Sequence, residues 1–214
     1  MASSSSSHRF WDRIAERYDE RTSEELDAYH ELRLEHMRGF LQPEDSVLDF
    51  ACGPGRAALD LAPYVGNVLG IDLSTRMIER ADAKLTDGEP TNVRFAAIDL
   101  FNPELDNRRF SVVTAFNILH LLDDPSRYLQ RLSELLAPDG LLIAETPCLA
   151  HKRWYVRVAI RLIGSTRWLP RAQIWAAEDV ERLVAGQGFE IVEAMLLDHE
   201  IGDPWLVART RAAR

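Results

Sequence analysis

The stretch Val-Leu-Asp-Phe-Ala-Cys-Gly-Pro-Gly at residues 47–55 decides the fold of this chain. A short apolar run stops near Asp49, and the chain then breaks into a tight Gly-Pro-Gly turn. A buried strand followed at once by glycines is how an α/β sheet presents bare backbone amides to a ligand. The stretch therefore predicts a strand followed by a ligand-binding turn.

A second acidic residue strengthens this interpretation. Gly70-Ile71-Asp72 ends the next apolar run with a carboxylate, 17 residues after Gly55. This is close to the usual separation between a glycine-rich loop and the acid that binds a ribose in a doubly wound nucleotide-binding fold. The two features together predict a nucleoside-containing cofactor.

Composition limits the class of protein. The 214 residues are 46% hydrophobic and 28% charged, which is ordinary for a globular protein with a full core. No apolar stretch approaches the length of roughly 18 to 20 residues that a membrane helix needs. The net charge of −9 argues against a general nucleic-acid binder.

The chain is expected to form one domain. Residues 1–8 are a serine-rich stretch without an apolar signal core, which predicts a disordered tail. Residues 9–214 form the single domain, with N-terminal helices at 9–41 and a cap insertion at 146–177. Cys52 and Cys148 follow strands that are not expected to be neighbours, so they are too far apart to bridge. Two unpaired thiols favour a reducing, cytoplasmic location.

Strands and helices alternate after residue 45, which predicts a mostly parallel sheet with right-handed crossovers. Ser74 is expected to cap one helix, with Met77, Ile78 and Ala81 on its buried face, and Asp124-Pro125 begins another, with Leu129, Leu132 and Leu136 inward. A capping pattern at Thr22 and Glu25 opens a helix that reaches about residue 40. The predicted strands are 46–50, 68–71, 93–98, 111–116 and 141–145, with a final hairpin at 190–197 and 205–209, and the other predicted helices are 8–20, 56–62 and 178–185.

In the order of these strands, helices and motifs, the chain resembles the class I S-adenosylmethionine-dependent methyltransferases of the small-molecule type. The resemblance runs from about residue 10 to residue 209, and its motifs are specific as an ordered set. They are Phe-Trp-Asp-Arg-Ile-Ala-Glu-Arg-Tyr-Asp (10–19), the stretch 47–55, Gly-Ile-Asp-Leu-Ser-Thr-Arg-Met-Ile (70–78), Ala-Ile-Asp-Leu (97–100), Phe-Asn-Ile-Leu-His-Leu-Leu (116–122) and Leu-Ala-Pro-Asp-Gly-Leu-Leu (136–142). The resemblance implies a doubly wound, Rossmann-like α/β fold with seven strands in the order 3-2-1-4-5-7-6 and the last strand antiparallel.

The same resemblance implies a set of residues that bind S-adenosylmethionine. They are Tyr18, Asp49, Ala51, Gly53, Gly55, Asp72, Leu73, Met77, Asp99, Leu100, Phe116 and Asn117. Asp49 would face the methionine amino group, Asp72 both ribose hydroxyls, and Asp99 the exocyclic amine of adenine. One departure stands out, since Ala51 occupies a position that is often glycine in this family.

His120 is a candidate general base, because it lies where the carboxyl edge of the sheet is expected. A structural or solvated histidine fits the same position, so both interpretations stay open. No cysteine or histidine spacing indicates a metal site.

The segment from Thr146 to Ala177 has no acidic residue and six basic ones, Lys152, Arg153, Arg157, Arg161, Arg167 and Arg171. Arg153, Arg157 and Arg161 would form one stripe on a helix. This stripe is either the solvated face of a cap helix or a surface for an anionic, lipid-like substrate or for weak contact of residues 151–171 with a membrane.

The predicted function is methyl transfer to a small-molecule acceptor, through an oxygen, nitrogen or carbon nucleophile, by an in-line displacement driven mainly by positioning. A nucleic-acid acceptor is disfavoured, because Ile118-Leu119 follows Asn117 where methylation of nucleobase amines needs a Pro-Pro-aromatic motif. One alternative is a nicotinamide-dependent oxidoreductase, although Ala58 breaks the third glycine of its fingerprint. Another is a catalytically idle module that binds the cofactor or a lipid surface. The sequence specifies neither the acceptor nor the oligomeric state.

Overall fold

The computed structural model describes residues 10–16, 24–86, 88–148, 150, 172–197 and 203–211. Four predictions lie outside these residues. They are the serine-rich tail at 1–8, the position of Tyr18, the capping role of Thr22 and the basic stripe at 151–171.

The centre of the molecule is a seven-stranded sheet in the order β3-β2-β1-β4-β5-β7-β6, which confirms the predicted topology. Every pair up to β5 is parallel, whereas β7 runs antiparallel to both β5 and β6. The strands are β1 (Ser46–Phe50), β2 (Asn67–Ile71), β3 (Val93–Ala96), β4 (Phe110–Phe116), β5 (Leu136–Glu145), β6 (Phe189–Leu196) and β7 (Pro204–Thr210).

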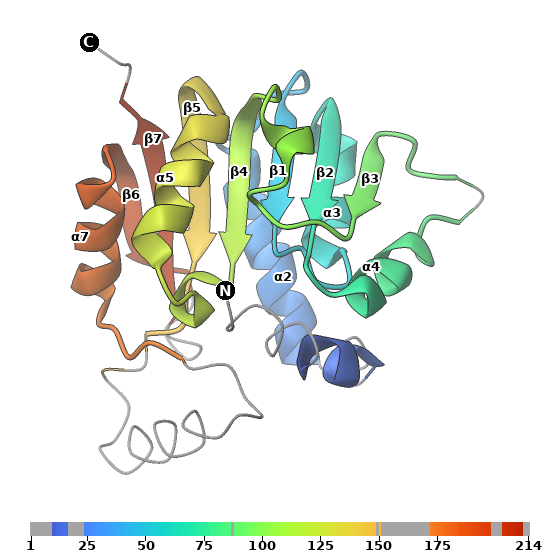
Figure 1. Ribbon diagram of the computed structural model, residues 1–214, viewed down its shortest axis with the longest axis horizontal. Helices are drawn as coiled ribbons and strands as arrows, with labels where there is room; N and C mark the ends of the chain where they lie inside the picture. Colours follow the sequence, from blue (N-terminus) through green and yellow to red (C-terminus); the bar gives the residue numbers. More distant parts are fainter. Residues whose placement is uncertain are drawn as a thin grey trace.

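Helices cover both faces of the sheet, as Figure 1 shows with α2 behind it and α5 and α7 in front. The helices are α2 (Glu24–Arg38), α3 (Arg56–Leu61), α4 (Thr75–Asp82), α5 (Pro125–Leu135) and α7 (Ala177–Gly186), with short 3-10 turns η1 (Ala62–Tyr64), η2 (Pro103–Leu105) and η3 (Leu119–Leu121). The segment 10–16 is also helical, and it lies below the arrowheads of the parallel strands in Figure 1. It therefore lies at the carboxyl edge of the sheet, where ligands bind in open α/β folds.

Two hydrophobic cores form because alternate residues of each strand point to opposite faces. On the α2 face, Val47, Val112, Ile143 and Val207 pack with Met37 of α2. On the α5 face, Leu48, Val113, Leu142 and Ala208 pack with the buried leucines of α5. The period of two then places Asp49, Thr114 and Glu145 on the α2 face.

Two of the predicted helix starts are confirmed. The Ser74 hydroxyl accepts from the Met77 amide, and Asp124 accepts from the Arg127 amide. Met77, Ile78 and Ala81 are buried on α4, as their spacing predicts.

Two predicted boundaries are wrong. Leu136 is not the last inward residue of a helix but the first residue of β5, where it pairs with Phe110. The Pro138-Asp139-Gly140 segment forms an irregularity inside this strand, with Asp139 at a φ of 60°, instead of a turn before it. The third strand ends at Ala96, two residues before the predicted end.

Cys52 and Cys148 are both free thiols, as the predicted strand order requires. Within the described ranges, no helix combines the length and the apolar character needed to span a bilayer.

Candidate functional site

A cavity of about 700 Å³ lies at the carboxyl edge of β1, β2, β3 and β4. Its volume is in the range of sites that bind small molecules. Nine of the twelve predicted cofactor residues line it, namely Ala51, Gly53, Asp72, Leu73, Met77, Asp99, Leu100, Phe116 and Asn117. The structure therefore brings together residues that are up to 66 positions apart in the sequence, from Ala51 to Asn117.

Asp72 is held by the backbone of two loops. Its Oδ1 accepts from the Ser74 amide at 2.8 Å, and its Oδ2 accepts from the Gly53 amide at 3.0 Å. Burial raises the pKa of Asp72, while these backbone donors oppose the shift. Each carboxylate oxygen keeps further acceptor capacity, so both remain able to accept from a pair of ligand hydroxyls.

The two glycines of the turn have different environments. Gly53 lines the cavity at a φ of 54°, and a Cβ added to it would meet no described atom within 4 Å. Gly55 is buried at a φ of 80°, and its Cβ would lie 2.6 Å from the Phe95 ring and 2.8 Å from the Ala81 methyl group. Gly53 therefore leaves space for a ligand, whereas Gly55 allows the turn to pack on the protein itself.

Ala51 also has a left-handed backbone, with a φ of 58°. This conformation costs a residue with a Cβ roughly 1–2 kcal/mol, which explains why glycine suits the position. Ala51 lines the cavity, and the Cys52 amide next to it donates to the Ile71 carbonyl of β2.

One end of the cavity combines apolar surface with a carboxylate. Leu73 is 42% exposed, whereas Met77 and Leu100 are almost fully buried beneath the cavity wall. Asp99 accepts from the Phe101 amide at 2.8 Å through Oδ1, so its carboxylate is oriented before any ligand binds. This end is suited to a flat base that carries an amino group.

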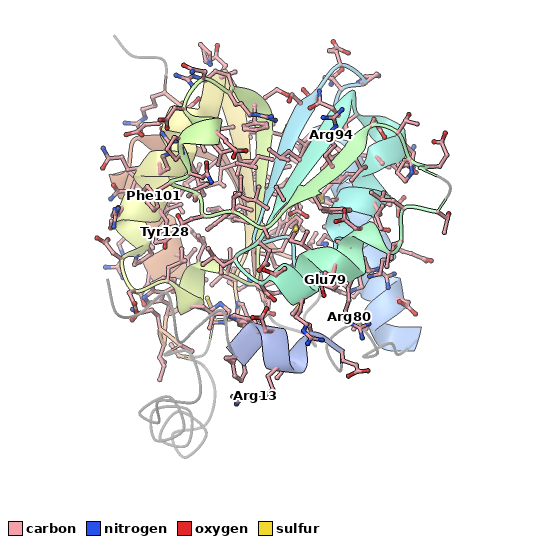
Figure 2. All side chains as sticks on the ribbon, turned by 45° about the vertical axis from the view of Figure 1, so that its right-hand side comes forward. Arg13, Glu79, Arg80, Arg94, Phe101 and Tyr128 are labelled. Carbon is pink, nitrogen blue, oxygen red and sulfur yellow. The ribbon has the colours of Figure 1, made fainter. Side chains whose placement is uncertain are left out.

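An aromatic wall on the α5 side was not predicted from the sequence. The Phe50 and Tyr128 rings stack with centroids 5.9 Å apart, and Phe101 meets Tyr128 edge-on at 5.1 Å. Figure 2 shows Phe101 and Tyr128 next to each other on this side. All three line the cavity, and Arg127 covers the Phe101 ring at 4.2 Å. In the sequence, Tyr128 in the first turn of the helix after β4 could have indicated this aromatic wall.

Asp49 lies beneath the turn rather than in the cavity wall formed by the described residues. It is 2% exposed, and its Oδ1 accepts from the Thr114 hydroxyl at 2.7 Å. Its Oδ2 is buried and has no hydrogen-bond partner within the described ranges. Burial raises the pKa of Asp49 to about 6. A buried acceptor atom of this kind fits a ligand ammonium group.

Arg33 of α2 is a second group that the sequence analysis missed. Arg33 is 5% exposed as a residue, and its guanidinium lies 4.4 Å from the centre of the Phe116 ring and 3.7 Å from Glu145 Oε2. Tyr29, Arg33 and Met37 are all buried and follow one another at intervals of four. An arginine in the buried stripe of an otherwise surface helix was the signal that could have revealed it.

The end of β4 lies between the cavity and the Arg33–Glu145 pair. Phe116 lines the cavity and is paired with Glu145 of β5, and the Asn117 amide donates to the Glu145 carbonyl at 2.8 Å. Asn117 has a φ of 56°, so the chain leaves the strand abruptly at this point.

His120 is buried, and burial lowers its pKa to about 4, so the ring is neutral at pH 7. It is not among the described residues that line the cavity, and its Nδ1 has no hydrogen-bond partner among them. His120 therefore has no direct contact with the cavity that the described residues form.

Comparisons with known proteins agree with this arrangement. A protein of Mycobacterium tuberculosis named as an uncharacterised methyltransferase is 30% identical over 113 residues, which are 51% of this chain and 56% of that protein. A ubiquinone biosynthesis O-methyltransferase of Rhodopseudomonas palustris is 24% identical over 74% of this chain and 64% of its own length. The matched part of the chain thus spans less than two thirds of either relative.

Among solved structures, the DhpI–SAH complex has the same fold, with a TM-score of 0.76 and 19% identity over 99% of this chain and 98% of that one. The family model described as a methyltransferase domain matches residues 17–194. The model covers most of the chain, including β1 to β5 and every cavity-lining residue except Trp11. The chain therefore belongs to the methyltransferase-domain family, the class I S-adenosylmethionine-dependent methyltransferases.

Proposed function

We propose that this chain binds S-adenosylmethionine in the cavity and transfers its methyl group to a small-molecule acceptor. The observation that carries the proposal is that Asp72 lies in one cavity with the open Gly53 turn and the Asp99 carboxylate. Asp72 can accept hydrogen bonds from the ribose, the Gly53 turn leaves space for the methionine part, and Asp99 can accept a hydrogen bond from the amino group of the base. The apolar and aromatic wall around them supplies the buried surface that a nucleoside needs.

We assign the adenosine part to Asp72, Leu73, Met77, Asp99 and Leu100, as the family resemblance implies. Asp72 would accept from the ribose hydroxyls, and Asp99 from the exocyclic amine. Phe50 and Tyr128, which the sequence analysis did not include, extend this part of the cavity. Tyr18 stays a proposal that rests on the resemblance alone.

The methionine part requires one group for an ammonium and one for a carboxylate. Asp49 Oδ2 is a buried acceptor with unused capacity, and the Arg33 guanidinium is a buried cation on the same face of the sheet. We therefore assign the ammonium to Asp49 and the carboxylate to Arg33, with Gly53 and Ala51 leaving room for the chain between. Gly55 contributes indirectly, because it lets the turn adopt its shape.

S-adenosylmethionine supplies a methyl group that its sulfonium already activates. The protein then needs mainly to align the acceptor, and it needs a base only where the acceptor is protonated. Phe116 and Asn117, at the end of β4, are the residues that would exclude water from the reacting atoms. We do not assign a role in the reaction to His120, because burial lowers its pKa to about 4 and makes the neutral ring a weak base.

The acceptor class is supported by several observations. The relative from Rhodopseudomonas palustris is named as an O-methyltransferase of ubiquinone biosynthesis, which favours a small organic acceptor. The net charge of −9 disfavours nucleic acid. The basic residues at 151–171 remain a proposed surface for an anionic or lipid-like acceptor, or for a membrane headgroup layer.

Calorimetric titration of the purified protein with S-adenosylmethionine, S-adenosylhomocysteine and NAD tests the proposal. We expect saturable binding of the first two compounds at one site and no saturable binding of NAD. NAD binding without S-adenosylhomocysteine binding would favour the oxidoreductase alternative. An idle cofactor-binding module would bind S-adenosylhomocysteine but release none from S-adenosylmethionine with any acceptor.

The buried Asp49 predicts a pH dependence of cofactor binding. Its pKa in the free protein is about 6, so the carboxylate is ionised above this pH and protonated below it. An ammonium group binds only the ionised form, so affinity for S-adenosylhomocysteine should be level above pH 7. It should fall by up to about tenfold for each pH unit below 6.

Asp49→Asn is the matched variant for this prediction. The amide keeps an acceptor for Thr114 but carries no charge, so its affinity should be low at pH 7.5 and should depend much less on pH. Because burial raises the pKa of Asp49 in the folded state, ionisation destabilises the fold above pH 6, and the variant should melt no lower than the wild type. An identical pH profile in both proteins would exclude Asp49 as the titrating group.

A further inference from the structure

We propose that the acceptor presents a hydroxyl group to Glu145, and that Glu145 takes the hydroxyl proton during methyl transfer. This inference rests on the proposed methyl-transfer function and names the class of its acceptor. The Tyr29 and Thr146 hydroxyls complete the subsite, and Arg33 positions the Glu145 carboxylate.

The location of Glu145 supports this role. Glu145 ends β5, the strand next to β4, and it is paired with Phe116 of the cavity wall. Asp49 and Thr114 are paired neighbours on the α2 face of the sheet, and Glu145 lies on the same face two residues beyond Ile143, the β5 partner of Thr114. Arg33 of α2 packs on this face against the Phe116 ring. Glu145 lies beside the cavity rather than in the wall that the described residues form, and an acceptor that extends past Phe116 toward β5 would meet it.

The unused hydrogen-bonding atoms support a hydroxyl in particular. Three side chains that are at least nine-tenths buried carry polar atoms without a close hydrogen-bond partner within the described ranges, namely Tyr29 Oη, Glu145 Oε2 and Thr146 Oγ1. The Tyr29 hydroxyl and the Glu145 carboxylate lie near enough to interact with each other. Buried polar atoms are nearly always paired, so such a group indicates a missing ligand atom. A hydroxyl both donates and accepts, so it can donate to Glu145 and accept from Tyr29 or Thr146.

The chemistry of the subsite disfavours a charged ligand group. The Arg33 guanidinium is 3.7 Å from Glu145 Oε2 and is also the group that we assign to the cofactor carboxylate. A carboxylate ligand would meet the Glu145 charge, and it has no proton to donate. An ammonium ligand offers no acceptor for the Tyr29 or Thr146 hydroxyls.

The proton transfer balances without another reactant. The O–H bond of the acceptor breaks, and its proton goes to Oε2 of Glu145. The oxygen forms a bond to the methyl carbon, and the electron pair of the broken carbon–sulfur bond stays on sulfur, which becomes a neutral sulfide. Burial raises the pKa of Glu145, which makes its carboxylate a stronger proton acceptor than an exposed one.

The test uses three small probes with the protein saturated by S-adenosylhomocysteine. Phenol carries a hydroxyl, benzylamine an ammonium group and benzoate a carboxylate, all on the same ring. Ligand-observed NMR should show saturable binding of phenol and no saturable binding of benzoate. Glu145→Gln should weaken phenol binding at least about tenfold, and Tyr29→Phe should weaken it as well, because the Tyr29 hydroxyl is one of the donors of the subsite.

Glu193→Gln is the matched control. Glu193 is a carboxylate on the neighbouring β6 that accepts from His36 at 2.6 Å and from the Trp205 indole at 3.1 Å. Its carboxylate is thus already engaged by two groups of the protein, so phenol binding should equal that of the wild type. S-adenosylhomocysteine should bind Glu145→Gln no more weakly than the wild type, because the variant leaves Arg33 in place for the cofactor carboxylate, and this separates the inference from the cofactor assignment.

Three results would overturn the inference while the cofactor assignment stands. They are absence of saturable phenol binding in the S-adenosylhomocysteine complex, phenol binding that survives both Glu145→Gln and Tyr29→Phe, and tighter binding of benzylamine or benzoate than of phenol. Failure of the wild-type protein to bind S-adenosylhomocysteine would instead contradict the proposed function.

Discussion

Replacing Asp72 with alanine is expected to weaken S-adenosylhomocysteine binding about 5- to 150-fold, which corresponds to about 1 to 3 kcal/mol. The reason is that the carboxylate is the group we assign to the two ribose hydroxyls. Hydrogen bonds to a charged acceptor are stronger than those to a neutral one. Calorimetry at pH 7.5 measures the change directly.

The structure adds a second consequence of this substitution. Asp72 also accepts from the Gly53 and Ser74 amides, so alanine leaves both donors without their partner. Asp72→Asn keeps the size of the side chain and one acceptor oxygen, so it should melt closer to the wild type and lose less affinity than Asp72→Ala. Unchanged affinity in Asp72→Ala would contradict the ribose assignment.

Replacing Gly55 with alanine is expected to destabilise the fold by about 2 to 5 kcal/mol. A left-handed backbone with a Cβ costs about 1–2 kcal/mol, and forcing a methyl group into a packed core costs typically 1–3 kcal/mol. Both apply, because Gly55 has a φ of 80° and its Cβ would lie within 2.8 Å of Phe95 and Ala81. Urea unfolding monitored by circular dichroism measures the loss.

Gly53→Ala is the matched substitution two residues away. Its backbone is also left-handed, but no described atom lies within 4 Å of the added Cβ. We therefore expect a loss of only about 1 to 2 kcal/mol in stability. Its methyl group would occupy the cavity, so S-adenosylhomocysteine binding should fall more than stability does. Equal stability losses in the two variants would contradict the different roles assigned to these glycines.

Much of the fold could be predicted because local sequence and tertiary structure agree. The apolar run before Asp49 forms the buried β1 at the predicted residues, and Ser74 caps α4 because its hydroxyl can reach the Met77 amide. The nine cavity-lining residues were predicted from the family resemblance. Most of them lie at or just after strand ends, and the ends of parallel strands meet at one edge.

The remaining parts of the site depend on contacts that the sequence does not express locally. The packing role of Gly55 depends on Phe95, which is 40 residues away on β3. Arg33 meets Glu145 only because α2 crosses the ends of β4 and β5. The strand boundary at Leu136 was missed because the Pro138-Asp139-Gly140 segment resembles a turn, although it forms an irregularity within a strand. Sequence patterns describe neighbours along the chain, whereas these features join different elements.

A crystal structure of the protein with S-adenosylhomocysteine tests the central claim most directly. The account predicts density for one molecule in the cavity, with its ribose hydroxyls within hydrogen-bonding distance of Asp72 and its amino group within hydrogen-bonding distance of Asp49 Oδ2. Density at any other place, or a ribose that does not contact Asp72, would contradict it.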